Sequence, residues 1–223
     1  MSKIYVFSGL GVDRRVFANI DFKNLDVEFI DWIEPLKNED IKAYAKRISQ
    51  SIKANNPILI GLSFGGILAI EISKIINTEK VILIASAKTK NELPKVYRCA
   101  GKFKLNKLVP ILILKQSNFI TNWFFGIKAK SENIMLKNIL KNTDPVFLKW
   151  AINEIVNWKN ELIPEKYIHI HGDKDKIIPI KNIKADFIIK NGGHFMTVNK
   201  SKEIEKIIQA VCLSESLADN ITD

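Results

Sequence analysis

Short apolar strands alternate with amphipathic helices along this chain, and the alternation leaves few folds open. Six runs rich in β-branched or aromatic residues are bounded by turn-forming residues; they cover 4–7, 27–32, 57–62, 81–85, 167–171 and 186–190. Apolar residues recur at helical spacing between several runs, namely Ile41, Tyr44, Ala45, Ile48 and Ile52, then Leu68, Ile72, Ile75 and Ile76, and finally Ile204, Ile207, Ile208 and Val211. Because near-continuous apolar runs are typical of strands covered on both faces, we expect a three-layer α/β/α sandwich with a mostly parallel six-stranded sheet.

One long interval breaks the alternation. About eighty residues between Ala85 and Tyr167 show no clear strand pattern, but they contain an aromatic cluster, Trp123-Phe124-Phe125, and a helical run made of Phe147, Trp150, Ala151, Ile155 and Trp158. A loop of that length without structure is improbable in a compact domain. We therefore expect residues 88–160 to form a helical cap inserted into a core made of residues 1–87 and 161–223.

The excess positive charge lies in the same interval. The chain has 34 Lys and Arg against 24 Asp and Glu, a formal net charge of +10, which over a whole protein would suggest a nucleic-acid or anionic-membrane partner. Residues 1–87 carry 11 basic and 10 acidic groups and residues 161–223 carry 9 and 10, whereas residues 88–160 carry 14 and 4. The charge is therefore a property of the predicted cap.

The lysines of the predicted cap allow two interpretations. Arg is scarce there, and phosphate and base recognition favours Arg, so we expect no nucleic-acid partner. Lys is scattered without a stripe, which favours lysines that simply solvate exposed helices. The alternative is a cationic, aromatic lid that suits an acyl substrate with an anionic head, such as a coenzyme A thioester, or that contacts anionic lipid.

Compartment and membrane association follow from the cysteines and the apolar stretches. Cys99 and Cys212 are too few for a disulfide framework and lack metal-ligand spacing, so we expect a reduced, cytoplasmic compartment and no metal. The N-terminus shows no secretory signal pattern. The longest apolar stretch, 109–127, is interrupted by Lys115, Gln116, Asn118 and Asn122, so we expect no transmembrane segment. The sequence does not set an oligomeric state.

The strongest chemical motif is Gly61-Leu62-Ser63-Phe64-Gly65, which reads G-x-S-x-G directly after a buried strand and directly before a helix. A nucleophile elbow needs this context, because the sharp turn strains the serine backbone and its neighbours two positions away must lack Cβ. The serine oxygen then stands at a helix N-terminus, where N–H groups stabilise developing negative charge. The alternative is a Gly-rich turn with an incidental serine.

A nucleophilic serine needs a base, and the chain has only three histidines. His169 and His171 alternate with isoleucines, so both point to the same side of a buried strand or its exit, which favours hydrogen-bonded core histidines. His194 follows two glycines between the last strand and the last helix, so its loop can fold back over the serine. We expect His194 to be the base.

The acid that orients the base has two candidates after the fifth strand. The segment His171-Gly172-Asp173-Lys174-Asp175 continues to a proline at 179, and the pattern H-G-x-x-D-x-x-x-P points to Asp175. Gly-Asp directly after a strand is ordinary turn chemistry, which favours a structural role for Asp173. We expect Asp175 to hold the imidazole and favour its charged form.

Taken together and in this order, the three motifs around Ser63, Asp175 and His194 resemble the α/β-hydrolase superfamily, with residues 88–160 where the family inserts its cap. The resemblance covers essentially the whole chain and implies a serine nucleophile, but it does not specify a substrate. It implies that backbone N–H groups of Leu10 and Phe64 form the oxyanion hole. This chain has Ser8-Gly9 where many members have His-Gly, and we expect it to lack the family's leading β-hairpin.

The resemblance implies hydrolysis of a small or medium carboxylic ester or thioester through an acyl-enzyme, without a cofactor. The partner would be a small-molecule acyl substrate. One alternative is a lyase or C–C bond hydrolase that uses the same three residues. Another is a non-catalytic ligand-binding or scaffold protein, because a fold alone does not establish activity.

Overall fold

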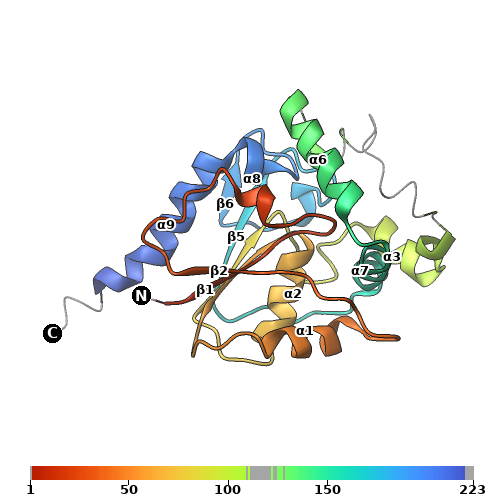
Figure 1. Cartoon of the computed structure of the whole chain (residues 1–223), viewed down its shortest axis with the longest axis horizontal. Helices are drawn as coiled ribbons and strands as arrows, with labels where there is room; N and C mark the ends of the chain where they lie inside the picture. The colour runs from red at the N-terminus through yellow and green to blue at the C-terminus, as the bar shows by residue number, and fades with distance from the viewer. Residues whose placement is uncertain (1, 109, 111–121, 123–124, 128, 219–223) are drawn as a thin grey trace.

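The computed structural model describes residues 2–108, 110, 122, 125–127 and 129–218. Six of their segments form one sheet in the order β2-β1-β3-β4-β5-β6, with every neighbouring pair parallel (Figure 1). The strands are β1 (Ile4–Phe7), β2 (Val27–Ile30), β3 (Ile58–Leu62), β4 (Lys80–Ile84), β5 (Tyr167–Gly172) and β6 (Phe187–Ile189). Each overlaps one of the six apolar runs. The predicted six-stranded sheet is therefore confirmed, and within the described residues it is parallel throughout.

Helices and helical turns connect the strands. They are η1 (Arg14–Phe17), α1 (Ile41–Ser49), α2 (Phe64–Ser73), α3 (Lys95–Lys102), η2 (Leu105–Leu108), α6 (Lys130–Asn142), α7 (Pro145–Asn157), η3 (Ile180–Asn182), α8 (Met196–Asn199) and α9 (Ser201–Ala218). Aspartates cap the N-termini of α1 and α7: Asp40 accepts a hydrogen bond from the Ala43 N–H at 2.8 Å, and Asp144 accepts one from the Phe147 N–H at 2.7 Å.

Some residues that the spacing assigns to helices lie just beyond them. The first helix ends at Ser49 and the second at Ser73, so Ile52, Ile75 and Ile76 follow helix ends. Ile52 and Ile76 still pack against the buried core, which explains why they continue the apolar pattern, whereas Ile75 is exposed.

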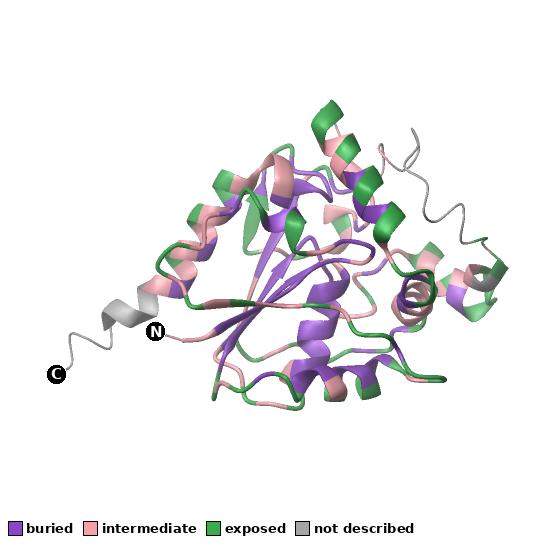
Figure 2. Cartoon of the chain, in the orientation of Figure 1, coloured by how far each residue is buried: buried purple, intermediate pink, exposed green. Residues whose placement is uncertain are grey.

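The sheet separates two apolar clusters, which makes the three layers. Figure 2 shows that α2 and most of the sheet are buried. Alternate side chains of β1 illustrate the division, because successive residues of a strand face opposite sides. Ile4 and Val6 join the cluster with η1 and α9, and Tyr5 and Phe7 join the one with α1 and α2. Each fully buried side chain of this size contributes about 1.5–3 kcal/mol relative to an exposed one. The predicted sandwich is confirmed.

The described part of the interval between β4 and β5 is helical and rests on both clusters. Leu136, Ile139 and Leu140 of α6 pack on the side of α9, whereas Phe147 and Ala151 of α7 pack on the side of α1 and α2. In Figure 1, α3, α6 and α7 lie together on one side of the molecule.

Part of the predicted cap cannot be described. Trp123, Phe124 and Lys115 lie outside the described residues. None of the described helices is long and apolar enough to cross a bilayer.

One lysine of this interval differs from a solvating surface charge. Lys88 is 3% exposed, and Asn160 at the far end of the interval donates to its carbonyl oxygen at 2.8 Å. The positive charge of Lys88 is therefore part of the interior, although a count of charges along the sequence places it on the cap.

Candidate active site

The parallel topology brings the three predicted residues to one edge of the sheet. Ser63 follows β3, Asp175 lies beyond β5, and His194 lies beyond β6. The carboxyl ends of parallel strands share one edge, which is where open α/β sheets bind their ligands. Ser63 and Asp175, which are 112 positions apart in the sequence, can therefore contribute to the same site.

The backbone of Ser63 is held in a strained conformation, with φ of 52° and ψ of −116°. The flanking glycines permit it. A Cβ on Gly61 would lie 2.4 Å from the Gly65 carbonyl oxygen, and a Cβ on Gly65 would lie 2.3 Å from the Ser8 carbonyl oxygen. The N–H of Ser63 donates to the Ile84 carbonyl oxygen at 2.9 Å, which ties the turn to the end of β4. This is the strand–turn–helix context that a nucleophile elbow requires.

Ser63, His194 and Asp175 form a hydrogen-bonded line. The Ser63 Oγ lies 2.9 Å from His194 Nε2, and His194 Nδ1 lies 2.8 Å from Asp175 Oδ2. The second oxygen of Asp175, Oδ1, accepts from the N–H groups of Ile177 and Ile178, each at 2.9 Å. Because Oδ1 is held by the backbone, Oδ2 is left to face the imidazole.

Asp175 is fully buried, yet its environment favours the charged form. Burial raises the pKa of the Asp175 carboxyl, but His194, His171 and the Ile178 N–H together outweigh burial and hold that pKa below its ordinary value. An ionised acid at this position accepts the Nδ1–H of His194 and leaves Nε2 as an acceptor for the serine hydroxyl.

The other acid candidate points elsewhere. The N–H of Asp173 donates to the Ile189 carbonyl oxygen at 3.2 Å, so the residue belongs to the connection between β5 and β6. Its Oδ1 is buried and makes no hydrogen bond among the described residues. The carboxylate beside His194 is that of Asp175.

Two predicted N–H donors flank Ser63. Phe64 is the first residue of α2, so its N–H has no carbonyl acceptor within the helix. Leu10 lines the same pocket as Ser63, in a turn where the Val12 N–H donates to the Gly9 carbonyl oxygen at 3.2 Å.

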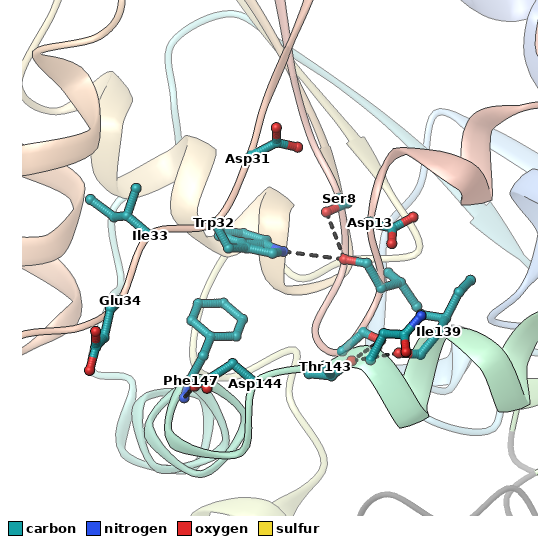
Figure 3. A pocket seen from close by; sticks show the side chains of 13 residues that line it. Ser8, Asp13, Asp31, Trp32, Ile33, Glu34, Ile139, Thr143, Asp144 and Phe147 are labelled. Atoms are coloured by element: carbon teal, nitrogen blue, oxygen red, sulfur yellow. Dashed lines mark hydrogen bonds between the residues drawn. The ribbon is translucent and has the colours of Figure 1, made fainter.

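Three side chains hold the turn that contains Leu10 (Figure 3). Ser8 Oγ and Trp32 Nε1 both donate to the Val12 carbonyl oxygen, at 2.9 and 3.3 Å. Thr143 Oγ1 lies 2.8 Å from the Gly11 carbonyl oxygen. Figure 3 shows these side chains around a pocket that Asp13, Asp31, Glu34 and Asp144 also line. The volume of this pocket is about 370 Å³. Ser8, which stands where many family members have His, therefore stabilises its own turn through a side-chain hydrogen bond.

A cavity of about 530 Å³ opens in front of Ser63 and His194. Its described lining is mostly apolar and includes no Lys, Arg, Asp or Glu; the polar side chains in it are those of Ser63, Tyr97, Asn106 and His194. Side chains of α3 and α7 supply much of it: Tyr97, Ala100, Leu148, Ile152, Ile155 and Val156. The basic residues of the predicted cap are absent from this part of the lining, which favours lysines that face solvent over lysines that select the substrate.

An aromatic residue from the interval contacts the base. The Phe125 ring packs edge-on against the His194 ring, with centroids 5.8 Å apart. The Phe125 carbonyl oxygen also accepts from the Phe195 N–H at 3.1 Å. Of the aromatic cluster noted in the sequence, this residue is the one that the structure describes, and it fixes one face of His194.

The remaining histidines are buried behind the acid. His169 and His171 are both 0% exposed and hydrogen-bonded, which agrees with core histidines. Burial lowers the pKa of His169 to about 2, and it lowers the pKa of His171 although Asp175 opposes the effect. Among the residues that the structure describes, no group of three His, Cys, Asp or Glu side chains is arranged to hold a metal ion.

Sequence reasoning did not find the pocket-lining residues of α3 and α7. The run from Phe147 to Trp158 has helical spacing, and this spacing cannot distinguish a side chain that packs on the core from one that lines a cavity. Lys88, behind His169, gave no signal, because lysine is almost never fully buried.

The structure is similar over nearly its whole length to solved structures of enzymes. A hydrolase from Oleispira antarctica shares 15% sequence identity at a TM-score of 0.69, with 93% of this chain and 89% of that chain covered. An esterase from Thermogutta terrifontis, solved with malate bound, shares 12% identity at 0.64, with 96% and 90% covered. A bromoperoxidase from Bacillus anthracis shares 14% identity at 0.66, with 93% and 91% covered.

At these identities the similarity concerns the fold and leaves the reaction open. No protein-family model matches the sequence, and no curated protein does.

Proposed function

Since this chain has the α/β-hydrolase fold that its motifs predicted, we propose that it is a serine hydrolase that cleaves a carboxylic ester or thioester through an acyl-enzyme. The observation that carries the proposal is the line from Ser63 Oγ through His194 to Asp175, with contacts of 2.9 and 2.8 Å. A nucleophile within reach of a base that a third group orients is the signature of covalent catalysis.

In the proposed reaction, Ser63 Oγ attacks the acyl carbonyl carbon while His194 Nε2 takes the hydroxyl proton. The N–H groups of Phe64 and Leu10 stabilise the oxyanion of the tetrahedral intermediate. The intermediate expels the alcohol or thiol, which receives the proton from His194, and the acyl group stays on Ser63. Water then attacks the acyl-enzyme with His194 as base, which releases the carboxylic acid and restores the serine.

The cavity in front of Ser63 indicates the class of acyl group. A space of about 530 Å³ whose described lining is mostly apolar and carries no ionic side chain favours a neutral aliphatic or aryl acyl group of small to medium size. An anionic head group inside this part of the cavity would lose its hydration without gaining a cationic partner. We therefore propose neutral esters and thioesters with apolar acyl groups as substrates.

Labelling with a fluorophosphonate probe tests the nucleophile. We expect the wild-type protein to label and the Ser63→Ala variant not to label. A wild-type protein that fails to label, or a variant that labels equally, would overturn the proposal. Labelling without turnover of any ester or thioester would instead favour a lyase or a C–C bond hydrolase.

A series of p-nitrophenyl esters from acetyl to palmitoyl tests the reaction and the acid. We expect Asp175→Asn to reduce kcat by several orders of magnitude, because the imidazole then adopts the wrong tautomer. The matched control is Asp173→Asn, which we expect to retain activity. A greater loss from the control would show that the acid has been wrongly assigned.

A further inference from the structure

A line of buried polar groups continues from Asp175 away from the serine. His171 Nε2 lies 3.5 Å from Asp175 Oδ2, the same oxygen that His194 contacts. His171 Nδ1 lies 3.3 Å from His169 Nε2, and His169 Nδ1 lies 3.1 Å from Lys88 Nζ. Burying such a line is costly unless each member is hydrogen-bonded, and the reaction described above does not require it.

The far end of the line is a fully coordinated ammonium group. Lys88 Nζ lies 3.1 Å from His169 Nδ1, 2.9 Å from Glu92 Oε1 and 2.8 Å from the Lys184 carbonyl oxygen. These three neighbours use the three protons of the ammonium, which can only donate. His169 Nδ1 must therefore accept, and the proton of a neutral His169 lies on Nε2.

The tautomer of His169 in turn determines which nitrogen of His171 carries the proton. His169 Nε2–H donates to the Ser86 carbonyl oxygen at 3.1 Å and faces His171 Nδ1. His171 Nδ1 is therefore an acceptor site, and its proton lies on Nε2, which donates to the Ile178 carbonyl oxygen at 2.8 Å. The opposite tautomer would turn a lone pair toward both this carbonyl and Asp175.

We infer that His171 is a positioning residue for Asp175, kept as its Nε2–H tautomer by the line that ends at Lys88. Its N–H faces the same Oδ2 atom that His194 contacts and also binds the Ile178 carbonyl. The Ile178 N–H in turn holds Asp175 Oδ1. His171 thus fixes the peptide that binds one carboxylate oxygen and lies beside the other, and this role rests on the proposed function of the triad.

Among the described residues, the charged and titratable groups around the line come from the loops after β5 and β6, the segment after β4, α3, β5 and the segment before β6. They are Asp175, His194, Lys88, Glu92, Tyr97, Tyr167 and Asp186. Asp186 Oδ2 accepts from the His169 backbone N–H at 2.8 Å. Burial and the neighbouring ammonium both lower the pKa of His169, which favours neutral imidazoles in this line.

The first test is spectroscopic and independent of activity. With three histidines, each imidazole can be assigned by single substitution in ¹⁵N-labelled full-length protein. At pH 7 we expect His169 and His171 each to show a protonated Nε2 and an unprotonated Nδ1. A proton on Nδ1 of either residue, or a doubly protonated ring, would overturn the inference.

The second test compares two substitutions at one position with p-nitrophenyl butyrate. His171→Leu removes the N–H, whereas His171→Gln retains an amide N–H at nearly the same reach. We expect His171→Leu to lower kcat about 10- to 100-fold with little change in KM, because a slightly displaced acid misaligns the base. We expect His171→Gln to recover most of that loss.

The pH profile separates positioning from simple destabilisation. Without the His171 N–H, the charge of Asp175 acts undiminished on the catalytic imidazole, so the acid limb of kcat/KM moves to higher pH in His171→Leu. The control is Trp158→Phe, which removes the buried hydrogen bond of 2.8 Å from Trp158 to Glu71; neither residue is a member of this line. It should lower stability without moving that limb.

The outcomes distinguish this inference from the proposed function. Equal kcat and an unmoved acid limb in folded His171→Leu, as judged by circular dichroism, would overturn the positioning role while wild-type labelling at Ser63 keeps the hydrolase proposal. A His171→Gln variant as impaired as His171→Leu would also count against the N–H. Failure of wild-type labelling would overturn the hydrolase proposal, whereas the tautomers measured by ¹⁵N spectroscopy would still test the line.

Discussion

The Ser86 hydroxyl donates to the Ser63 carbonyl oxygen at 2.6 Å, so a side chain that follows β4 holds the strained turn that follows β3. We expect Ser86→Ala to lower the free energy of unfolding by about 1 kcal/mol, because one buried hydrogen bond is lost while the carbonyl keeps helical partners. The rate of fluorophosphonate labelling should fall as well. Urea unfolding and labelling kinetics measure the two effects.

The matched control is Ser73→Ala, at the other end of α2. The Ser73 hydroxyl donates to the Ile70 carbonyl oxygen at 2.9 Å, so a similar bond is lost far from the site. We expect comparable destabilisation with an unchanged labelling rate. Equal labelling rates for both variants would show that Ser86 does not tune the turn.

Gly65 cannot accept a side chain without moving the loop that carries Leu10. A Cβ there would lie 2.3 Å from the Ser8 carbonyl oxygen and 2.5 Å from that of Phe7, and both are backbone atoms that cannot rotate away. We expect Gly65→Ala to destabilise the protein by about 3 kcal/mol or more and to abolish turnover. Thermal unfolding monitored by circular dichroism checks the prediction, which a stable and active variant would contradict.

Ala100 of α3 lines the apolar cavity, so a larger side chain there should shorten the acyl groups that fit. We expect Ala100→Phe to shift the optimum of a p-nitrophenyl ester series toward acetyl, mainly through KM for the longer chains. Val96→Phe enlarges the same helix at a position that is 66% exposed, and it should leave the profile unchanged. Parallel shifts in both variants would mean that α3 does not bound the acyl site.

His169 makes stability depend on pH in the acidic range. Its pKa is about 2 in the folded protein and near 6.5 in the unfolded chain, so the unfolded state binds more protons between these values. The contribution of His169 is present above pH 6.5 and is lost as pH falls toward 2. Each such proton adds a slope of up to about 1.4 kcal/mol per pH unit.

Urea unfolding at pH 7, 6 and 5 measures this slope above the range where carboxylates titrate. We expect the wild-type free energy of unfolding to decrease as the pH is lowered from 7 to 5. In His169→Gln this free energy should depend less steeply on pH. The same slope in both proteins would mean that folded His169 takes up a proton readily.

The sheet and the elbow could be predicted because their signals are local. The apolar run Ile58–Leu62 predicts the strand, and Ser63 with glycines two positions away on either side predicts the turn. The position of His194 after the last strand was similarly readable, since parallel strands deliver their following loops to one edge. Choosing Asp175 over Asp173 required a motif, because both follow the same strand.

The line behind the acid could not be predicted, because it depends on contacts between distant segments. Lys88 and His169 are 81 positions apart, and nothing local distinguishes this lysine from those that face solvent. The residues that line the cavity could not be predicted either. The sequence around Ala100 does not say whether this residue faces the cavity or the core. Leu10 was assigned by position, and its role as an N–H donor remains a prediction.

The strands that precede Ser63 and His194 differ in how firmly they are paired in the sheet. Ser63 follows β3, which is paired on both sides, whereas His194 follows β6, a three-residue strand that within the described part of the chain pairs with β5 alone. Fraying begins at such margins, where few contacts must be broken. Gentle heating should therefore detach the base while the nucleophile is still folded in place, so that catalysis is lost reversibly before the molecule melts.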